Sequence, residues 1–465
     1  MSNEAKFLNL VEKLPHAHVP FFRRPFASRR DFFKVLGGGV AGSFLAGNAN
    51  AQLIRSQNVT TKNTAKNVIF ILLTGAPSHT DTFDLKFIDG VSPAGFKPEM
   101  IKGMNFNTGV FPKIAAQLDD VAVVRSVRAW AAQHTLSQTW VQIGRSPAAV
   151  LGDIAPNIGS IVAIEKKPER TPGQLFPTFL ALNADGAVGS GYLPASYEPF
   201  KVTPNAAGLA NTTNPDGVTR FNEKVGLLES LDNPLRINSP HAEVMQDYGD
   251  FYKSARGLMY NPTVDKAFKY TTADSARYGN TGFGNALLTA KQVLEANSGT
   301  RYIQITLGGW DMHSNIYSQV ANVNSLFSLG RTLDNGYGTL LADLKASGIL
   351  NETLIVMMGE FGRTVGPLND QMGRDHYTQQ FATFAGGGIK GGRAIGATDA
   401  QGARTTDFGW SEGRDIRVED IEATIYSALG INWLTIRRDD PFGRGFEYVP
   451  EANTGAYEPV HELWN

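Results

Sequence analysis

The sequence contains no cysteine in its 465 residues. This absence excludes disulfides, zinc–thiolate sites and iron–sulfur clusters, so a metal ion would have to bind through nitrogen and oxygen ligands. The chain also lacks an excess of charge of either sign, with a formal net charge of −1. This balance gives no reason to expect nucleic acid or an anionic membrane as a partner. Histidine is scarce, with eight residues, so the positions of the histidines carry information.

The first 51 residues have the features of an export signal. Arg29 and Arg30 precede Phe-Phe-Lys and the short apolar run VLGGGVAGSFLAG, and residues 49–51 (Ala-Asn-Ala) match a cleavage site. We therefore predict a twin-arginine signal peptide over 1–51, a linker over 52–66, and a periplasmic or secreted mature protein. The twin-arginine translocase would be a partner during export. The apolar run is too short for a permanent membrane anchor; an ordinary amphipathic helix is the alternative.

Short apolar runs along the rest of the chain predict the strands of a parallel α/β sheet. Residues 68–73 (VIFILL) form a continuous run, which is typical of a central strand covered on both faces. Residues 184–298 begin rich in Gly, Ala, Pro and Asn and continue with helical periodicity, so we predict an insertion or cap within a single domain, 67–465. Further strands are predicted at 121–127, 179–182, 302–307, 353–358 and 381–384, and helices at 134–144, 316–347 (broken near Asn335-Gly336) and 417–429.

Polar side chains follow the ends of four predicted strands, where open α/β sheets bind ligands. The strand at 302–307 ends in Gly308-Gly309 and is followed by Trp310, Asp311 and His313. Four of the six histidines beyond the leader fall in such positions, which favours one shared site over scattered surface histidines. The groups are Ser78/His79/Asp81, His134/Thr135, Asp311/His313, Glu360/Arg363 and the loop Arg374-Asp375-His376. Helix capping and ordinary hydrogen bonding are the alternative roles for the residues of each motif.

Carboxylates and imidazoles without thiols suit zinc, manganese, magnesium or calcium as a divalent metal ion. Arg363 and Arg374 suit the binding of a phosphate or sulfate, because guanidinium pairs bidentately with oxyanions. A structural ion pair with a nearby carboxylate is the alternative for either arginine. His134 and Thr135 stand at a predicted helix N-terminus, where free backbone N–H groups favour an anion.

The twin-arginine leader, LLTGAPSHTDTFDLK, GGWDMHSN, GEFGRT and GRDHY together resemble the domain of unknown function 1501 family, which is grouped with the alkaline phosphatase and sulfatase superfamily. The resemblance runs over most of the mature chain, with the motifs in the family's order. It implies a doubly wound α/β fold, a mostly parallel sheet with helices on both faces, metal ions bound by Asp and His at strand ends, and a Ser, Thr or modified residue as nucleophile. By this resemblance Asp311, His313 and His376 match metal-binding positions, and Glu360 stands where the superfamily has an Asp.

The sequence departs from the superfamily pattern in four places. The acidic residue that normally follows the first strand is displaced to Asp81 or Asp84. Asp311 and His313 are two residues apart instead of the usual four, and Phe361 occupies the position of a usual His. The residue nearest the nucleophile position is His134, which leaves Thr135 and Ser78 as substitutes. These departures favour a one-metal or remodelled site over a complete two-metal site.

We therefore expect an exported, metal-dependent hydrolase that acts on phosphate or sulfate esters of small molecules or glycans. Arg363 or Arg374 would stabilise charge on the transferring group. The alternative is a non-catalytic protein that binds a ligand or glycan on the same fold. The candidate metal ligands are His79, Asp81, Asp311, His313, Glu360, Asp375 and His376.

Overall fold

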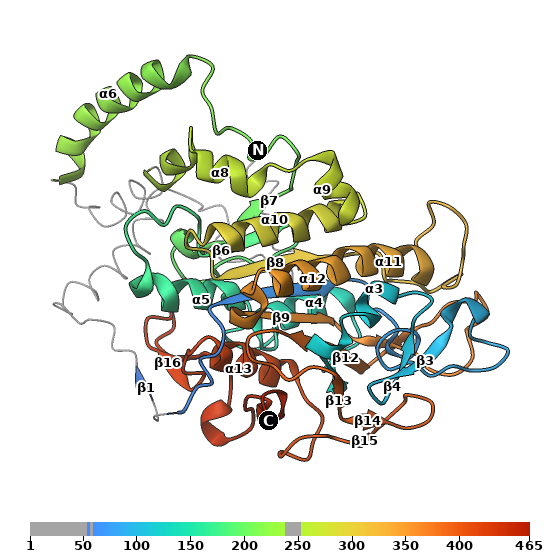
Figure 1. The fold of residues 1–465 in the computed structure, drawn as a ribbon. Helices are drawn as coiled ribbons and strands as arrows, with labels where there is room; N and C mark the ends of the chain where they lie inside the picture. Colours follow the sequence, from blue (N-terminus) through green and yellow to red (C-terminus); the bar gives the residue numbers. More distant parts are fainter. Residues whose placement is uncertain (1–53, 56–58, 238–252) are drawn as a thin grey trace, which may run out of the picture. The chain divides into compact units, whose positions relative to one another are not determined.

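The structure is a computed structural model that describes residues 54–55, 59–237 and 253–465 (Figure 1). Residues 54–465 form one unit, and all elements discussed below belong to it. The predicted signal peptide and parts of the predicted linker lie outside the described residues, so both stay predictions. None of the helices within the described ranges is both long enough and apolar enough to cross a bilayer.

The central sheet has eight strands in the order β13-β5-β12-β9-β2-β8-β6-β7. All neighbouring pairs are parallel except the two made by β12, which runs antiparallel to both β5 and β9. The mostly parallel sheet is therefore as predicted. The strands span Arg393–Ile395 (β13), Val121–Arg128 (β5), Gln379–Ala385 (β12), Thr353–Gly359 (β9), Asn67–Leu73 (β2), Tyr302–Thr306 (β8), Phe179–Leu182 (β6) and Phe200–Val202 (β7).

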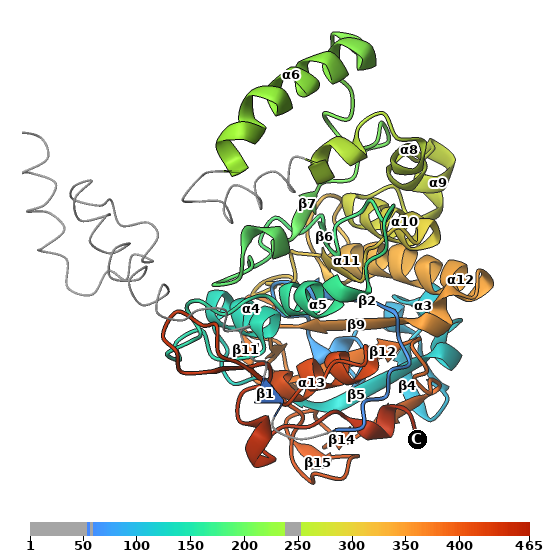
Figure 2. The same ribbon diagram turned by 90° about the vertical axis from the view of Figure 1, so that its left-hand side faces the viewer.

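Helices cover both faces of this sheet. In β2 the side chains alternate between the faces, so Ile69, Ile71 and Leu73 enter one core and Val68, Phe70 and Leu72 enter the other. Figure 2 shows α10, α11 and α12 on one side of β2 and β9, with α13 on the other. The helices span α3 (Pro112–Ala115), α4 (His134–Ile143), α5 (Ile158–Lys166), α6 (Gly217–Ile237), α8 (Pro262–Phe268), α9 (Thr272–Arg277), α10 (Gly282–Ala296), α11 (Leu326–Leu333), α12 (Thr339–Ala346) and α13 (Val418–Ala428).

The predicted helices at 134–144 and 417–429 are confirmed as α4 and α13. The long predicted helix at 316–347 is different. Its first ten residues form a loop, and α11 begins only at Leu326, where Ser325 supplies a capping box. The expected break near Gly336 is a π-helical turn, Asp334–Gly338, through which the chain passes into α12 without ending the helix.

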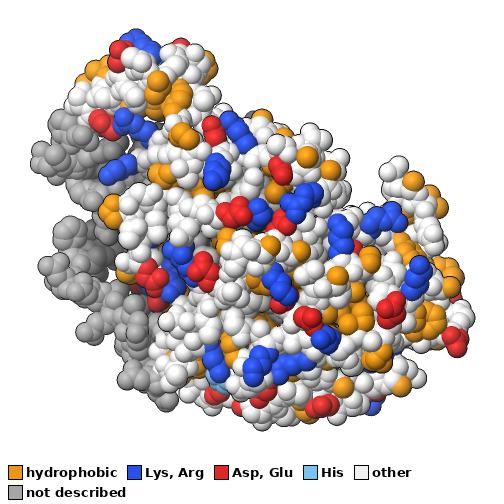
Figure 3. All heavy atoms as spheres, in the orientation of Figure 1, with side chains coloured by type: hydrophobic (Ala, Val, Ile, Leu, Met, Phe, Trp, Pro, Cys, Tyr) orange, Lys and Arg blue, Asp and Glu red, His pale blue; other side chains and the backbone are white. Residues whose placement is uncertain are grey.

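Residues 184–298 contribute to the body of the fold as well as to its periphery. Strand β7 lies at the sheet edge beside β6, and α10 packs on the sheet within the core that contains Ile69. This differs from the prediction of a cap made only of loop and helices. Over the face shown in Figure 3, Lys and Arg side chains are interspersed with Asp and Glu, in keeping with the balanced net charge.

Candidate metal centre

The strand directions bring distant segments to one edge of the sheet. Strands β5, β8 and β9 all end at this edge, and the antiparallel β12 begins there. His134 opens α4 after β5, Asp311 and His313 follow β8, and Glu360 follows β9. His376 belongs to β11 (His376–Tyr377), which pairs with β10 (Gly362–Arg363) and precedes β12.

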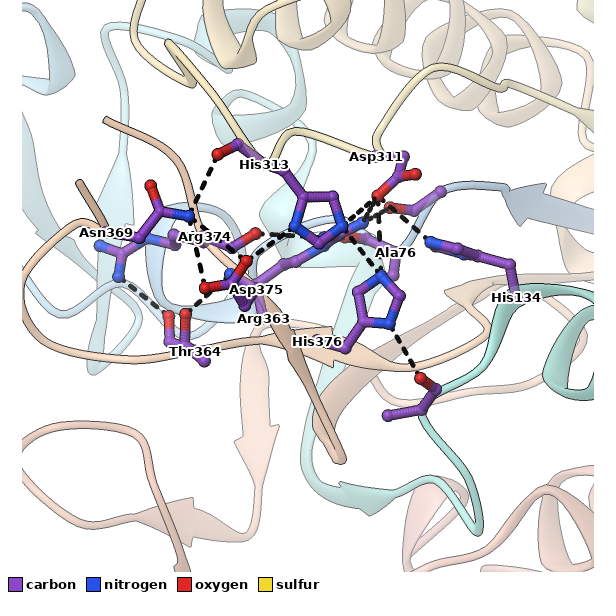
Figure 4. Close-up of polar contacts among 12 residues, drawn as sticks. Ala76, His134, Asp311, His313, Arg363, Thr364, Asn369, Arg374, Asp375 and His376 are labelled. Carbon is purple, nitrogen blue, oxygen red and sulfur yellow. Dashed lines mark hydrogen bonds and ion pairs between the residues drawn. The ribbon is translucent and has the colours of Figure 1, made fainter. Parts of the chain in front are cut away.

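Four of these side chains converge into a single cluster (Figure 4). Each of His134, Asp311, His313 and His376 offers one ligand atom, and these atoms lie within 4.8 Å of one another. From Asp311 Oδ1 the Nε2 atoms lie 3.0 Å away in His313, 3.2 Å in His134 and 3.8 Å in His376. Within the described ranges this is the one group of three or more such residues that is arranged to hold a metal ion.

The other nitrogen of each imidazole is held by an acceptor. His376 Nδ1 lies 2.9 Å from the carbonyl oxygen of Ala132, His134 Nδ1 lies 2.8 Å from Glu360 Oε1, and His313 Nδ1 lies 2.7 Å from Asp375 Oδ1. A carbonyl oxygen can only accept, and so can an ionised carboxylate, so in each histidine Nδ1 carries the proton. When the three rings are neutral, their Nε2 atoms therefore present lone pairs to the cluster.

The neutral form of this cluster suits a cation. His134 Nε2 is buried with Asp311 Oδ1 as its neighbour at 3.2 Å, and the Nε2 atoms of His313 and His376 face each other at 3.0 Å. Three lone pairs and a carboxylate oxygen at this spacing repel one another unless a positive charge lies among them. Histidines whose second nitrogen is fixed by a carboxylate or carbonyl are the usual form of metal-binding histidines. The residues therefore fit a metal ion.

The cluster is open to solvent on one side. The exposed fraction of the side chain is 24% for His134, 29% for His376, 42% for His313 and 47% for Asp311. Structural metal sites are closed, whereas sites that act on a substrate keep one position accessible. The arrangement can therefore admit a ligand beside the four protein groups.

Arg363 fixes the carboxylate of the cluster. Its side chain is buried, its Nη2 donates to Asp311 Oδ1 at 2.6 Å, and its Nη1 approaches His313 Nε2 at 3.2 Å. Partial burial opposes ionisation of Asp311, but the hydrogen bond and charge of Arg363 outweigh it and lower the pKa of Asp311. The hydrogen bond to Glu360 raises the pKa of His134, whereas burial lowers the pKa of His376. The charge of Arg363 therefore keeps the carboxylate ionised in the cluster.

Two glycines allow the backbone segments of the site to approach each other. Gly75 has a φ of +101°, and a Cβ there would lie 2.4 Å from the backbone nitrogen of Asp311. A Cβ at Gly373 would lie 2.0 Å from the carbonyl carbon of His313. Any side chain at either position would displace the loop that carries Asp311 and His313.

Glu360 and Asp375 were predicted as metal ligands. In the structure both lie outside the four-residue cluster and contact its histidines. The buried carboxylate of Glu360 accepts from the backbone N–H of Gly75 and Ala76 and from Gln138, besides His134. The Asp375 carboxylate contacts His313 and Asn369. Both carboxylates therefore orient a histidine of the cluster.

His79 and Asp81 lie outside the cluster, contrary to their predicted role as ligands. The buried carboxylate of Asp81 pairs with Arg374, with 2.7 Å between Oδ2 and Nε, and accepts from the hydroxyl of Tyr317. His79 is fully buried, and its Nε2 lies 2.8 Å from the carbonyl oxygen of Gly402. Burial lowers the pKa of His79, so the ring is neutral and Nε2 donates. Both side chains are therefore buried and hydrogen-bonded to other residues of the chain.

The two arginines predicted to clamp an oxyanion are engaged in structural contacts. Arg374 donates to Asp81, to Tyr317 and to the carbonyl oxygens of Thr364 and Gly366. Arg363 donates to Asp311 and to the carbonyl oxygens of Gly75, Ala76 and Arg374. Because every N–H-bearing nitrogen of both guanidinium groups already has an acceptor, the ion-pair interpretation holds for both.

The two candidate nucleophiles differ in accessibility. Ser78 is buried, and its hydroxyl lies 3.3 Å from that of Thr80. Thr135 is exposed in the first turn of α4, directly after His134 of the cluster. His134 was predicted to lie near a nucleophile position and was not among the predicted metal ligands. It follows the end of a strand, as other predicted ligands do, and this position could have identified it as a ligand.

These features define a doubly wound α/β protein with a His–Asp cluster, suited to a metal ion, at the carboxyl edge of its sheet. A model of the family described as protein of unknown function DUF1501 matches residues 65–440, and the chain belongs to this family. No curated protein matches the sequence.

Similar solved structures include a sulfatase, a phosphonate monoester hydrolase and an alkaline phosphatase. The PsFucS1 sulfatase from Pseudoalteromonas sp. is 12% identical, over 87% of this chain and 72% of that one, with a TM-score of 0.39. The phosphonate monoester hydrolase of Agrobacterium radiobacter is 12% identical (86% and 77% covered, TM-score 0.38). TAB5 alkaline phosphatase is 14% identical (80% and 99% covered, TM-score 0.36). Such low identities give no basis for transferring activity or substrate.

Proposed function

We propose that this protein is a metal-dependent hydrolase of phosphate or sulfate esters, with the metal held by His134, Asp311, His313 and His376. The convergence of three Nε2 lone pairs on one carboxylate oxygen, with every Nδ1 held by an acceptor, carries the proposal. A divalent cation in such a site supplies Lewis acidity, which polarises an ester oxygen and acidifies water.

The donor set favours zinc or manganese over magnesium or calcium. Three of the four groups are imidazoles, whereas magnesium and calcium take oxygen ligands almost exclusively. The chain's own contribution is to hold protons and charges in place. Glu360, Asp375 and the carbonyl oxygen of Ala132 keep the Nδ1 protons of the cluster, and Arg363 keeps Asp311 ionised.

Thr135 is the group we propose to contact the ester. Thr135 is an exposed residue in the first turn of a ten-residue helix, where backbone N–H groups and the helix dipole favour an anion. Buried Ser78 is less suited to this role. The substrate is a small-molecule or glycan ester, and the protein acts in the periplasm or outside the cell after twin-arginine export.

The test is elemental analysis of the purified mature chain, followed by assays on aryl phosphate, aryl sulfate and phosphonate esters. We expect about one zinc or manganese ion per chain and hydrolysis of at least one ester class. The variant His376→Ala should lose both. His461→Ala is the matched control, because His461 lies outside the cluster in the C-terminal segment and should leave both unchanged. A metal-free chain that is inert on every ester would refute the proposal.

One observation favours a second candidate function. Apart from the Arg363 N–H that faces His313 Nε2, the guanidinium N–H groups of Arg363 and Arg374 already donate to other acceptors of the chain. A site that captures an anionic ligand or glycan on a metal ion, without turnover, needs no free N–H group to stabilise charge on a transferring group. Metal-dependent binding of a phosphate or sulfate ester that raises Tm, with no product formed, would favour this function over hydrolysis.

A further inference from the structure

A cleft lies just beyond the end of β5, where Trp130 forms part of its lining. It has a volume of about 330 Å³. We call it the arginine–aromatic cleft. Its main lining residues are Trp130, Phe408, Arg414, Asp415, Arg417 and Tyr457. None of them takes part in the metal cluster.

Three charged side chains line the arginine–aromatic cleft, and two of them are compensated. Arg414 forms two hydrogen bonds with Asp420, at 2.7 and 2.8 Å, which outweigh burial and raise the pKa of Arg414. Asp415 accepts from Thr405 at 2.6 Å and lies 3.8 Å from Arg128. Neither residue therefore needs a ligand to balance its charge.

Arg417 is the exception. Its Nη1 donates to the carbonyl oxygens of Arg128 and Ala129, and the guanidinium carbon lies 3.9 Å from the ring centre of Trp130. No carboxylate within the described residues forms an ion pair with it, and its Nε and Nη2 atoms have no partner there. Burial outweighs the charges of Asp415 and Glu419 and lowers the pKa of Arg417, so an anion in direct contact would stabilise this group further.

The aromatic wall of the cleft is fixed in place. Trp130 and Trp140 stack with 17° between their rings, and both indole N–H groups donate to the buried carboxylate of Glu419. Trp130 remains 45% exposed. A rigid, half-exposed indole beside a guanidinium that forms no ion pair within the described residues suits a ring-shaped ligand that carries an anion.

The cleft and the metal centre are close enough to share one substrate. Trp130 precedes His134 by four residues, which limits their Cα separation to about 14 Å. Between them Ala132 accepts from His376. Trp130 also borders a separate small cavity, which Trp140 and Glu360 help to line.

We infer that the arginine–aromatic cleft binds a carboxylate or sulfate group on a saccharide ring, so that the substrate carries a second anionic group besides the ester at the metal centre. The statement about the substrate rests on the proposed function, whereas binding in the cleft does not. One arginine without an ion pair in the described chain, set among aromatic rings in a protein of balanced charge, favours an anionic saccharide over nucleic acid.

The test measures equilibrium binding of short dextran sulfate, uncharged dextran of the same length and a single-stranded oligonucleotide to the mature chain, by titration calorimetry. We expect the wild type to bind dextran sulfate at least tenfold more tightly than either of the others. Arg417→Gln should lose at least tenfold in affinity for dextran sulfate. Arg417→Lys, which keeps the charge but not the planar fork, should lose less.

The matched control is Arg331→Gln, which removes one exposed arginine from α11 and should leave the affinity within twofold. Thermal melting confirms that each variant is folded. Equal losses in both glutamine variants, equal binding of dextran, or preferred binding of the oligonucleotide would overturn the inference, as would no binding at all. If Arg417-dependent binding is found but no ester is hydrolysed, the proposed function fails while the cleft stands as an anion site.

Discussion

The substitution Glu360→Gln tests how the metal centre is held. The Glu360 carboxylate accepts from four donors, and three of them point at Oε1: His134 Nδ1 at 2.8 Å, Gly75 N at 2.9 Å and Gln138 Nε2 at 3.0 Å. Ala76 N lies 3.2 Å from Oε2. A glutamine can keep its oxygen at the Oε1 position, but its amide group then faces the N–H of Ala76.

Two costs follow from this geometry. One buried donor is left without an acceptor, which costs about 1–3 kcal/mol of folding free energy. The Nδ1 proton of His134 also loses its charged acceptor, which makes Nε2 a weaker ligand. Loss of such an outer partner weakens metal binding by roughly 10–100-fold, or about 1.4–2.7 kcal/mol.

The zinc Kd of each variant is measured by competition with a chromogenic chelator, and unfolding is followed in urea. Gln138→Ala is the control, because it removes one neutral donor and leaves the contact between Glu360 and His134 in place. We expect its zinc Kd to change less than threefold. A zinc Kd for Glu360→Gln within twofold of the wild type would refute the orienting role of Glu360.

Three further outcomes are expected. Gly75→Ala should destabilise the chain by about 2–4 kcal/mol in urea unfolding, whereas Gly90→Ala, at a similar positive φ of +78° but with open space around it, should cost less. Burial raises the pKa of Glu422 to about 8 from 4.5. Between these pH values the folded chain holds a proton on Glu422 that the unfolded chain has lost, so the unfolding free energy falls as pH rises. Glu422→Gln should remove this loss, about 1.4 kcal/mol per pH unit, in urea unfolding at pH 6 and pH 8. Zinc at 100 times its Kd should raise the unfolding free energy by about 2.7 kcal/mol, an effect that EDTA reverses and that is absent from His376→Ala.

Much of the secondary structure could be read from local patterns. The apolar run at 68–73 became the central strand β2, and the helix predicted from 134 ends at Gly144, whose φ of +63° suits a helix stop. The stretch 316–325 was misread as helix. Apolar spacing there resembles a helical face, but Val320 and Val323 are exposed in a loop. The helix begins only after its N-cap, Ser325.

The site itself was partly predictable. Because parallel strands end at one edge, polar residues after them had to lie near each other, and Asp311, His313 and His376 do. The sequence could not show how far each side chain reaches. Glu360 and Asp375, which were predicted as ligands, instead hold histidines of the cluster, whereas His134, which was not predicted as a ligand, belongs to the cluster.

The sequence by itself determined the chemistry open to this protein. The lack of cysteine restricts a metal site to nitrogen and oxygen ligands, and the apolar runs that end in polar turns set the edge where such a site can form. Only the tertiary structure decided which groups meet. Asp81 and Asp311 both follow buried strands, yet Asp81 pairs with buried Arg374 while Asp311 faces three histidines. The choice depends on the loops from β2, β8 and β10, which are distant in the sequence, so no local pattern records it.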